Sequence, residues 1–348
     1  MTLDGRTVGE RAIVALDVGG ANLKLSDGRS HSHQVAFALW KQPLSLTDAI
    51  AALLAEAPSA DAVAVTMTGE LADCFSSKRQ GVSFILDCVC RAAEKLPVTV
   101  YLTDGRLVSL DEAVAVPQLA AASNWHVLAT FAARVAGPRS GCLIDIGSTT
   151  SDIIPFADGQ VIAQGSDDVG RLLSGELVYS GVGRTPVCGL IQAADYQGQR
   201  CSIAKEFFAT TQDVYLALDE LPELPHANDT ADGRPATKSA ARSRLARMFC
   251  VDGSSFSQDD AISLATLVAQ RQLDELLSAV MRVTGRLPTG LETFVISGSG
   301  EFLAKRVASG LDSNARVISM ARQFGADMSQ CATAYALARL MRGHDSDE

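Results

Sequence analysis

The sequence predicts an α/β protein with two related lobes around a central cleft. Three observations lead to this prediction. The chain has 348 residues, which is long for a single compact core. Runs of β-branched and apolar residues alternate with segments of helical spacing. The strand–turn–strand pattern of residues 12–25 returns at residues 141–154.

The first lobe is expected over residues 1–136. It opens with an apolar run in which a Gly-Gly turn separates two short strands. The alanine-rich segment 113–136 predicts one long helix after Pro117 that crosses between the lobes. Further elements of this lobe are expected as a helix over 46–56, a buried strand over 61–68, a helix over 81–95 and a strand over 98–102.

The second lobe is expected over residues 137–330, with a closing helix and a short tail over 331–348. Its opening strand and turn match those of the first lobe at an offset of 128 positions, from Asp17 to Asp145. A repeat of this length indicates duplicated lobes rather than a solenoid. The looser stretch between about residues 165 and 260 is expected to hold an inserted hairpin and helical region.

Composition and charge argue against two classes of partner. The net charge is −10, and no basic cluster stands out for nucleic acid or an anionic membrane. No apolar run approaches the roughly 18 residues that a membrane span needs. The eight cysteines are scattered and the N-terminus lacks an apolar signal region. We therefore expect a cytoplasmic protein with reduced thiols, which is free to form a homo-oligomer.

The two strand–turn–strand loops have the chemistry of phosphate-binding sites. Glycines at their turns let the backbone approach an anion closely, and successive N–H groups form a concavity that holds it. An aspartate precedes each turn, at Asp17 and Asp145. A carboxylate beside a phosphate is reasonable when Mg²⁺ or Mn²⁺ lies between them, because Mg²⁺ typically takes one or two carboxylates together with phosphate oxygens. The two aspartates are therefore predicted as metal ligands.

Further residues of these loops complete the predicted site. Lys24 supplies a positive charge for a phosphate. One such turn alone is typical of a plain hairpin with a solvated aspartate, whereas two copies at equivalent places favour phosphate binding. A Gly-Ser-Gly turn after the strand expected at 293–297 is either a plain tight turn or a cradle for a nucleotide or substrate. The predicted binding residues are Gly19, Gly20, Asn22, Lys24, Gly147, Ser148, Thr149, Thr150, Gly298, Ser299 and Gly300.

Three residues are weaker candidates. Arg184 and Arg234 stand in glycine-rich turns and are candidates for anion clamps, although surface exposure is the commoner fate of an arginine. Asp232 is a minor candidate for the metal shell. The histidines show no spacing typical of metal ligands.

The chain resembles the actin–hexokinase–Hsp70 superfamily, in which two phosphate loops and an adenosine-type loop occur in this order. The resemblance spans nearly the whole chain, from Ile13 to Leu340, and implies RNase H-like lobes. Within the superfamily the chain resembles the hydantoinase A/oxoprolinase group, and more closely the tetrahydromethanopterin-linked one-carbon pathway proteins. The segments that carry this resemblance in combination are LDVGGANLK from residue 16, VTMTGELAD from 65, GELVYSGVGRTP from 175, DTADGR from 229 and SGSGEFL from 297.

The resemblance implies a transferase of methanofuran-type cofactor biosynthesis. Such an enzyme joins the phenol oxygen of γ-glutamyltyramine, or of tyramine, to an aminomethylfuran methyl diphosphate and releases diphosphate. Mg²⁺ held by Asp17 and Asp145 would neutralise the leaving diphosphate. Lys24 would add its charge, and a carboxylate, either Glu70 or Asp152, would take the phenol proton.

Two other interpretations stay open at this point. One is an ATP-dependent enzyme of the same fold, either a small-molecule kinase or a hydantoinase/oxoprolinase-like amidohydrolase. The other is a non-catalytic nucleotide-binding regulator. The phosphate loops serve all three equally, since a fold does not determine a function. What separates them is whether the phosphorylated small molecule is ATP or an alkyl diphosphate.

Overall fold

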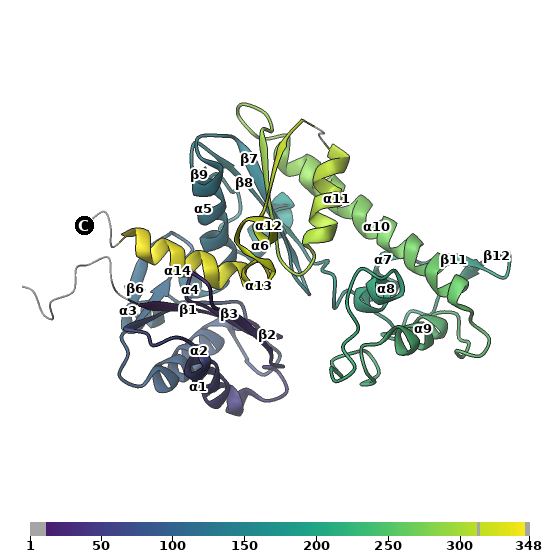
Figure 1. Ribbon diagram of the computed structural model, residues 1–348, viewed down its shortest axis with the longest axis horizontal. Coiled ribbons are helices and arrows are strands. Elements are labelled where there is room, and N and C mark those ends of the chain that lie inside the picture. The colour runs from purple at the N-terminus through teal and green to yellow at the C-terminus, as the bar shows by residue number, and fades with distance from the viewer. Residues whose placement is uncertain (1–11, 312–313, 345–348) are drawn as a thin grey trace, which may run out of the picture.

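The computed structural model describes residues 12–311 and 314–344. Within this part of the chain, two six-stranded sheets form the centres of two lobes (Figure 1). The first sheet has the strand order β3-β2-β1-β4-β5-β6. Its strands are β1 (Ile13–Val18), β2 (Asn22–Ser26), β3 (Ser32–Ala36), β4 (Ala62–Met67), β5 (Val98–Tyr101) and β6 (Leu107–Ser109).

The second sheet repeats this plan with the order β10-β8-β7-β13-β14, and β9 pairs with β8 at its side. Three antiparallel neighbours form one side of each sheet, β3-β2-β1 in the first and β10-β8-β7 in the second. The next two strands along each sheet run parallel to β1 or to β7. The two RNase H-like lobes are therefore confirmed. The strands of the second sheet are β7 (Gly141–Ile146), β8 (Ser151–Ala157), β9 (Gln160–Val161), β10 (Leu177–Val178), β13 (Thr293–Ser297) and β14 (Arg316–Ser319).

Helices cover the sheets and connect the lobes. In the first half of the chain they are η2 (Pro43–Ser45), α1 (Leu46–Glu56), α2 (Lys78–Ala93), α3 (Leu110–Ala115), α4 (Pro117–Ala120) and α5 (Asn124–Ala136). In the second half they are α6 (Asp168–Ser174), α7 (Val187–Leu190), α8 (Thr211–Ala217), α9 (Lys238–Arg247), α10 (Gln258–Thr284), α11 (Glu301–Leu311), α12 (Met320–Phe324), α13 (Ala326–Gln330) and α14 (Ala332–His344).

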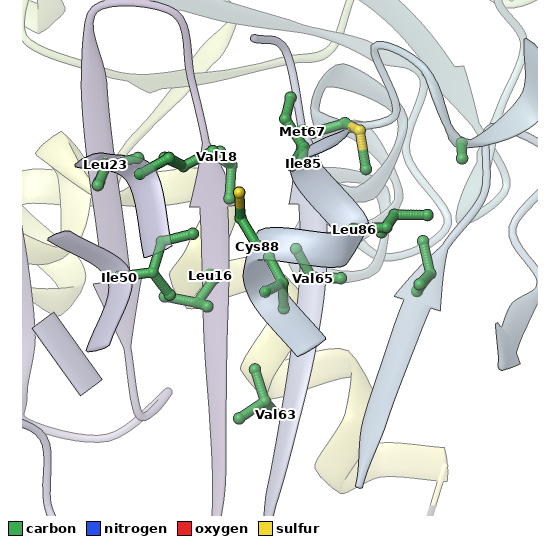
Figure 2. Close-up of a cluster of buried hydrophobic side chains, with 14 of the residues drawn as sticks. Leu16, Val18, Leu23, Ile50, Val63, Val65, Met67, Ile85, Leu86 and Cys88 are labelled. Carbon is green, nitrogen blue, oxygen red and sulfur yellow. The ribbon is translucent and has the colours of Figure 1, made fainter. Parts of the chain in front are cut away.

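The core of the first lobe lies between its sheet and the helices α1 and α2. Figure 2 shows Leu16 and Val18 of β1 and Val65 of β4 on the same side as Ile50 of α1 and Ile85 of α2. All five side chains are almost completely buried. Because burial of such a side chain stabilises the fold by about 1.5–3 kcal/mol, this layer fixes the strand whose end carries the first loop.

Two helices lie between the sheets. α5 packs against β7 and β8, α14 packs against β1 and β4, and the two helices pack against each other (Figure 1). Ile13 and Ala15 face this interior layer, whereas Val14 and Leu16 face the opposite side, as alternating residues of a strand must. The last helix of the chain therefore returns to the first sheet and joins the two lobes into one core.

The one long helix expected after Pro117 is wrong, because the chain from Pro117 to Ala136 divides into α4 and α5. Pro117 begins α4, and the preceding Val116 is displaced from helical geometry to φ −123° and ψ 56°, as a residue before proline commonly is. Between α4 and α5, Ala122 has a positive φ of 49°. Alanine rarely takes this left-handed conformation, so the break stores backbone strain.

An inserted region extends away from the two sheets (Figure 1). It contains the antiparallel hairpin of β11 (Ala193–Tyr196) and β12 (Gln199–Ser202), the helices α7 to α9, and one end of the long helix α10. This region has its own buried cluster, to which α10 contributes Ala261, Leu264 and Val268. Within the described residues, no helix is both long and apolar enough to cross a membrane.

Candidate active site

The two phosphate-type loops have the same backbone geometry. In the first loop, the N–H of Gly19 donates to the carbonyl of Asn22 at 3.0 Å. In the second, the N–H of Gly147 donates to the carbonyl of Thr150 at 2.9 Å. The donor and the acceptor both keep the offset of 128 positions, so the duplication seen in the sequence is also a duplication of loop structure.

Strand register extends the equivalence to the side chains beside the loops. Asp17 lies opposite Lys24 in the pairing of β1 with β2. Asp145 lies opposite Asp152 in the pairing of β7 with β8. Lys24 and Asp152 therefore occupy the same place in the two lobes. One lobe presents an aspartate beside a cation, and the other presents two carboxylates side by side.

The sequence predicted Asp17, Lys24, Asp145 and Asp152 as site residues, and the fold brings these four together. Burial raises the pKa of Asp17, while Lys24 lowers it and Asp152 raises it further. The pKa of Asp145 rises to about 6, first because of burial and then because of Asp152, although Lys24 lowers it. Lys24 belongs to the first lobe and Asp145 to the second, so the groups form one electrostatic cluster across the lobes.

One carboxylate oxygen of this cluster lacks a positively charged partner. The Nζ atom of Lys24 lies 4.0 Å from Oδ2 of Asp17, and Oδ1 of Asp17 is buried without a hydrogen-bond partner among the residues that the structure describes. A buried carboxylate oxygen without a partner is costly, so an additional positive charge would stabilise it. No three His, Cys, Asp or Glu residues of the described chain are arranged to hold a metal ion by themselves.

Two partners of these aspartates were missed by the sequence analysis. The hydroxyl of Ser297, at the end of β13, donates to Oδ1 of Asp145 at 2.6 Å. Arg171 of α6 is buried, bonds to the carboxylate of Asp152 and lies with its guanidinium 4.5 Å from the ring centre of Trp125. The parallel register of β13 with β7 would have indicated Ser297, because it stands opposite Asp145. No sequence signal marked Arg171.

The Gly-Ser-Gly turn after β13 packs directly on the second loop. Gly298 has φ 92°, and a Cβ there would lie 2.3 Å from the carbonyl oxygen of Ile146 and 2.8 Å from Oδ1 of Asp145. The N–H of Gly300 donates to the same carbonyl at 2.8 Å. Only glycine permits this conformation and this contact. The turn therefore sets the position of Asp145 through its backbone.

A second turn approaches the same loop from the segment between β10 and α7. The N–H groups of Gly183 and Arg184 both donate to the carbonyl of Ser148, at 2.9 and 2.8 Å. The guanidinium of Arg184 lies 4.3 Å from the ring centre of Trp40, which belongs to the first lobe. Arg184 therefore bridges the lobes beside the second loop instead of standing free on the surface.

Glu70 has a structural counterpart in the second lobe. The register places Thr66 opposite Asp17 and Ser297 opposite Asp145, so the positions that follow β4 and β13 also correspond. In that correspondence, Glu70 is equivalent to Glu301. Both glutamates follow a glycine whose N–H bonds to the strand carrying the phosphate loop.

The two glutamates differ in how many partners they have. Glu301 accepts hydrogen bonds from the hydroxyls of Ser319 and Ser329 and from the N–H of Ala321, at 3.0 Å for the last. Glu70 is 1% exposed, and its Oε2 has no hydrogen-bond partner in the described part of the chain. Burial raises the pKa of Glu70 to about 7, against the opposing effects of backbone N–H groups and of Lys78.

Two weaker candidates lie elsewhere. Asp232 forms ion pairs with Arg234 at 3.0 Å, with the buried Arg244 at 3.0 Å and with Arg247 at 3.3 Å. These three arginines leave no role for Asp232 in a metal shell. Arg234 is occupied by the same aspartate, so neither residue belongs to the cluster of paired aspartates. Both stabilise the inserted region, where Arg244 also bonds to Asp213.

Comparison with known proteins places the chain in a family. A family model described as hydantoinase/oxoprolinase matches residues 61–344. A curated relative from Methanocaldococcus jannaschii is 34% identical over 334 residues, which cover 95% of this chain and 97% of the relative. The chain belongs to the hydantoinase/oxoprolinase family. That relative is named (4-{4-[2-(γ-L-glutamylamino)ethyl]phenoxymethyl}furan-2-yl)methanamine synthase.

A second relative with the same name, from Methanococcus vannielii, is 33% identical over 202 residues, 58% of this chain and 90% of the relative. Two relatives named as synthases identify this member of the hydantoinase/oxoprolinase family as an enzyme. Among solved structures, the activator of the 2-hydroxyisocaproyl-CoA dehydratase from Clostridium difficile with bound ADPNP has 13% identity and a TM-score of 0.45, and 96% of each chain is covered.

Proposed function

We propose that the protein is a transferase of methanofuran-type cofactor biosynthesis. It joins the phenol oxygen of γ-glutamyltyramine to the methylene carbon of an aminomethylfuran methyl diphosphate. The new carbon–oxygen bond replaces the bond to the leaving diphosphate, and the phenol proton goes to a base. The single observation that carries this proposal is the 34% identity over 95% of the chain to a relative whose name describes this phenoxymethylfuran ether.

The paired loops form the diphosphate end of the proposed site. We expect other backbone N–H groups of the two turns to bind the anion, and Lys24 to add a positive charge. When bound, Mg²⁺ or Mn²⁺ held by Asp17 and Asp145 would supply the charge that stabilises the departing diphosphate. The unpartnered oxygen of Asp17 supports this assignment, because it lacks the positive partner that its burial calls for.

Two buried carboxylates are candidates for the base. Glu70 has one free oxygen and a pKa raised to about 7, near the value at which a general base works best at neutral pH. Asp152 lies beside Asp145, but its carboxylate is already bonded to Arg171. We assign the phenol proton to Glu70, because a carboxylate that is not held by an arginine is the better proton acceptor.

Ligand binding separates this proposal from an ATP-dependent activity. A diphosphate ester already carries its activation, so ATP has no part in the proposed reaction. We expect Mg²⁺ with an alkyl diphosphate to raise the melting temperature, whereas Mg²⁺ with ATP does not. At 100 times its dissociation constant a ligand stabilises the folded state by about 2.7 kcal/mol, which a thermal shift assay detects.

The variant Asp145→Asn tests the metal-binding part of the proposed site. This variant should lose the Mg²⁺-dependent stabilisation by the diphosphate ester, because it lacks the charge that holds the cation. The apo variant should melt no lower than the wild type, since the buried carboxylate it removes has a raised pKa. Asp158→Asn, at the exposed turn between β8 and β9, is the control and should respond as the wild type does. Stabilisation by ATP alone would instead support a kinase or hydrolase.

A further inference from the structure

A pocket of about 260 Å³ lies between the lobes, and neither metal-binding aspartate lines it. Its walls come from the N-terminus of α2, the end of α4 and the N-terminus of α6. The pocket therefore joins an element of the first lobe to an element of the second. Six of the lining residues carry the argument. They are the cations Lys78 and Arg79, the carboxylates Asp167 and Asp168, and the apolar Ala121 and Ala122.

The four charges of this pocket are not equally engaged. Nζ of Lys78 lies 2.6 Å from Oδ2 of Asp168, so these two groups neutralise each other across the lobes. Arg79 forms no ion pair with any residue of the described chain. Among the described residues, Asp167 accepts only from the N–H of Gly170, at 2.7 Å through one of its two oxygens. One positive and one negative side chain therefore stay available to a ligand.

The wall of this pocket also contains a residue with an unusual backbone conformation. Ala122 has φ 49°, a conformation that alanine avoids and that concentrates at binding sites. This strained residue lines the same pocket as the four charged side chains.

We infer that this pocket binds the zwitterionic α-amino acid end of the acceptor substrate. The inference rests on the proposed function, because the γ-glutamyl group named in the relative ends in an α-carboxylate and an α-ammonium. Arg79 and the N-terminus of α2 bind the carboxylate, since both present positive charge there. Asp167 binds the ammonium. The Lys78–Asp168 pair forms the floor between them.

The size of the pocket agrees with this assignment. Its volume is below the 300–1,000 Å³ of a site that encloses a whole drug-sized ligand, so it accepts one end of the acceptor. The phenol end then extends out of the pocket. A series of ion pairs connects the pocket to Asp145 and Asp17. Lys78 pairs with Asp168, Asp168 lies 3.9 Å from Arg171, and Arg171 pairs with Asp152, which stands beside Asp145. In this arrangement the amino-acid end of the acceptor contacts one end of this series of ion pairs, and the phenol end lies near the other.

Calorimetric titration with two phenols tests the inference. One is γ-glutamyltyramine, and the other is N-acetyltyramine, which has the same phenol and amide but no zwitterion. The wild type should bind the first at least about tenfold more tightly, because hydrogen bonds between charged groups are the strong ones. Arg79→Ala and Asp167→Asn should each weaken γ-glutamyltyramine binding by about tenfold and change N-acetyltyramine binding less than twofold. Asn at 167 keeps an acceptor for the N–H of Gly170.

Arg91→Ala is the matched control, since Arg91 is an exposed arginine of the same helix that pairs with Asp87. It should bind both phenols as the wild type does. Equal affinity of the wild type for the two phenols, or equal losses for both in Arg79→Ala, would overturn the inference. A loss in Arg79→Ala without a loss in Asp167→Asn would reduce the pocket to an anion site and contradict it as well. An ether assay on the wild type tests the proposed function separately, so the two can fail independently.

Discussion

At the scale of single residues, the two lobes place different side chains at equivalent positions. Lys24 of one lobe corresponds to Asp152 of the other, and Glu70 corresponds to Glu301. In each pair, one member is bonded to side chains or N–H groups of its own lobe. Arg171 holds Asp152, and two serines with a backbone N–H hold Glu301. Lys24 and Glu70, which both belong to the first lobe, can still bind another group.

Glu70→Gln should change how stability depends on pH. The pKa of Glu70 is raised in the folded state from 4.5 to about 7, so its ionisation disfavours folding. The stability associated with this group is fully present below pH 4.5 and is lost as the pH rises through 7. With each pKa unit worth about 1.4 kcal/mol, the loss is on the order of 3 kcal/mol. Gln cannot ionise, so the variant should become more stable than the wild type as the pH rises.

Urea unfolding at pH 5 and pH 8 measures this effect. We expect the free-energy difference between Glu70→Gln and the wild type to shift in favour of the variant by up to about 3 kcal/mol between the two pH values. Glu301→Gln is the comparison at the equivalent position. It should cost about 1–3 kcal/mol, because it disturbs a fully bonded carboxylate. An equal free-energy difference at both pH values for Glu70→Gln would contradict the assigned environment.

At the scale of elements, much of the fold and of the site could be predicted from the sequence. The apolar runs and the repeated Asp-x-Gly turn indicated both strand pairs and the equivalence of Asp17 with Asp145. The break between α4 and α5 was missed, because the alanine-rich composition favours helix on both sides of it. Arg171 was missed since its burial depends on Trp125 and Asp152, which only the fold brings near.

Gly298→Ala tests the role of the third turn. A Cβ at this position would meet the carbonyl of Ile146 at 2.3 Å while φ is 92°, so the turn must move away from the second loop. We expect diphosphate-ester binding, measured by calorimetry, to weaken by more than tenfold. Gly198→Ala is the control, because Gly198 has φ 75° in a hairpin turn with open space around it. The control should lose about 1 kcal/mol of stability and bind normally. Normal binding by Gly298→Ala would show that the turn does not position Asp145.

At the scale of the whole molecule, ion pairs of different burial connect the site to the interface between the lobes. The side chains of the Lys78–Asp168 pair are 38% and 25% exposed, whereas those of the Arg171–Asp152 pair are 2% and 8% exposed. A partly exposed pair contributes little to stability, because water screens it. A buried pair that loses one partner leaves an uncompensated charge.

Arg171→Met and Lys78→Met should therefore differ sharply in stability. Arg171→Met leaves the buried carboxylate of Asp152 without its partner and should cost about 3–5 kcal/mol. Lys78→Met should cost at most about 1 kcal/mol, and Asp168 keeps Arg171 as a neighbour at 3.9 Å. Urea unfolding at neutral pH checks both values. Equal losses in the two variants would mean that burial does not distinguish the pairs.

The most direct test of the proposed function is the product of the reaction itself. The purified protein is given the furan diphosphate, γ-glutamyltyramine and Mg²⁺, with ATP omitted, and the mixture is followed by mass spectrometry together with a diphosphate assay. We predict one ether and one diphosphate for each furan diphosphate consumed, at a rate that added ATP does not change. Absence of the ether from this mixture, with turnover appearing only when ATP is supplied with another substrate, would contradict the proposal.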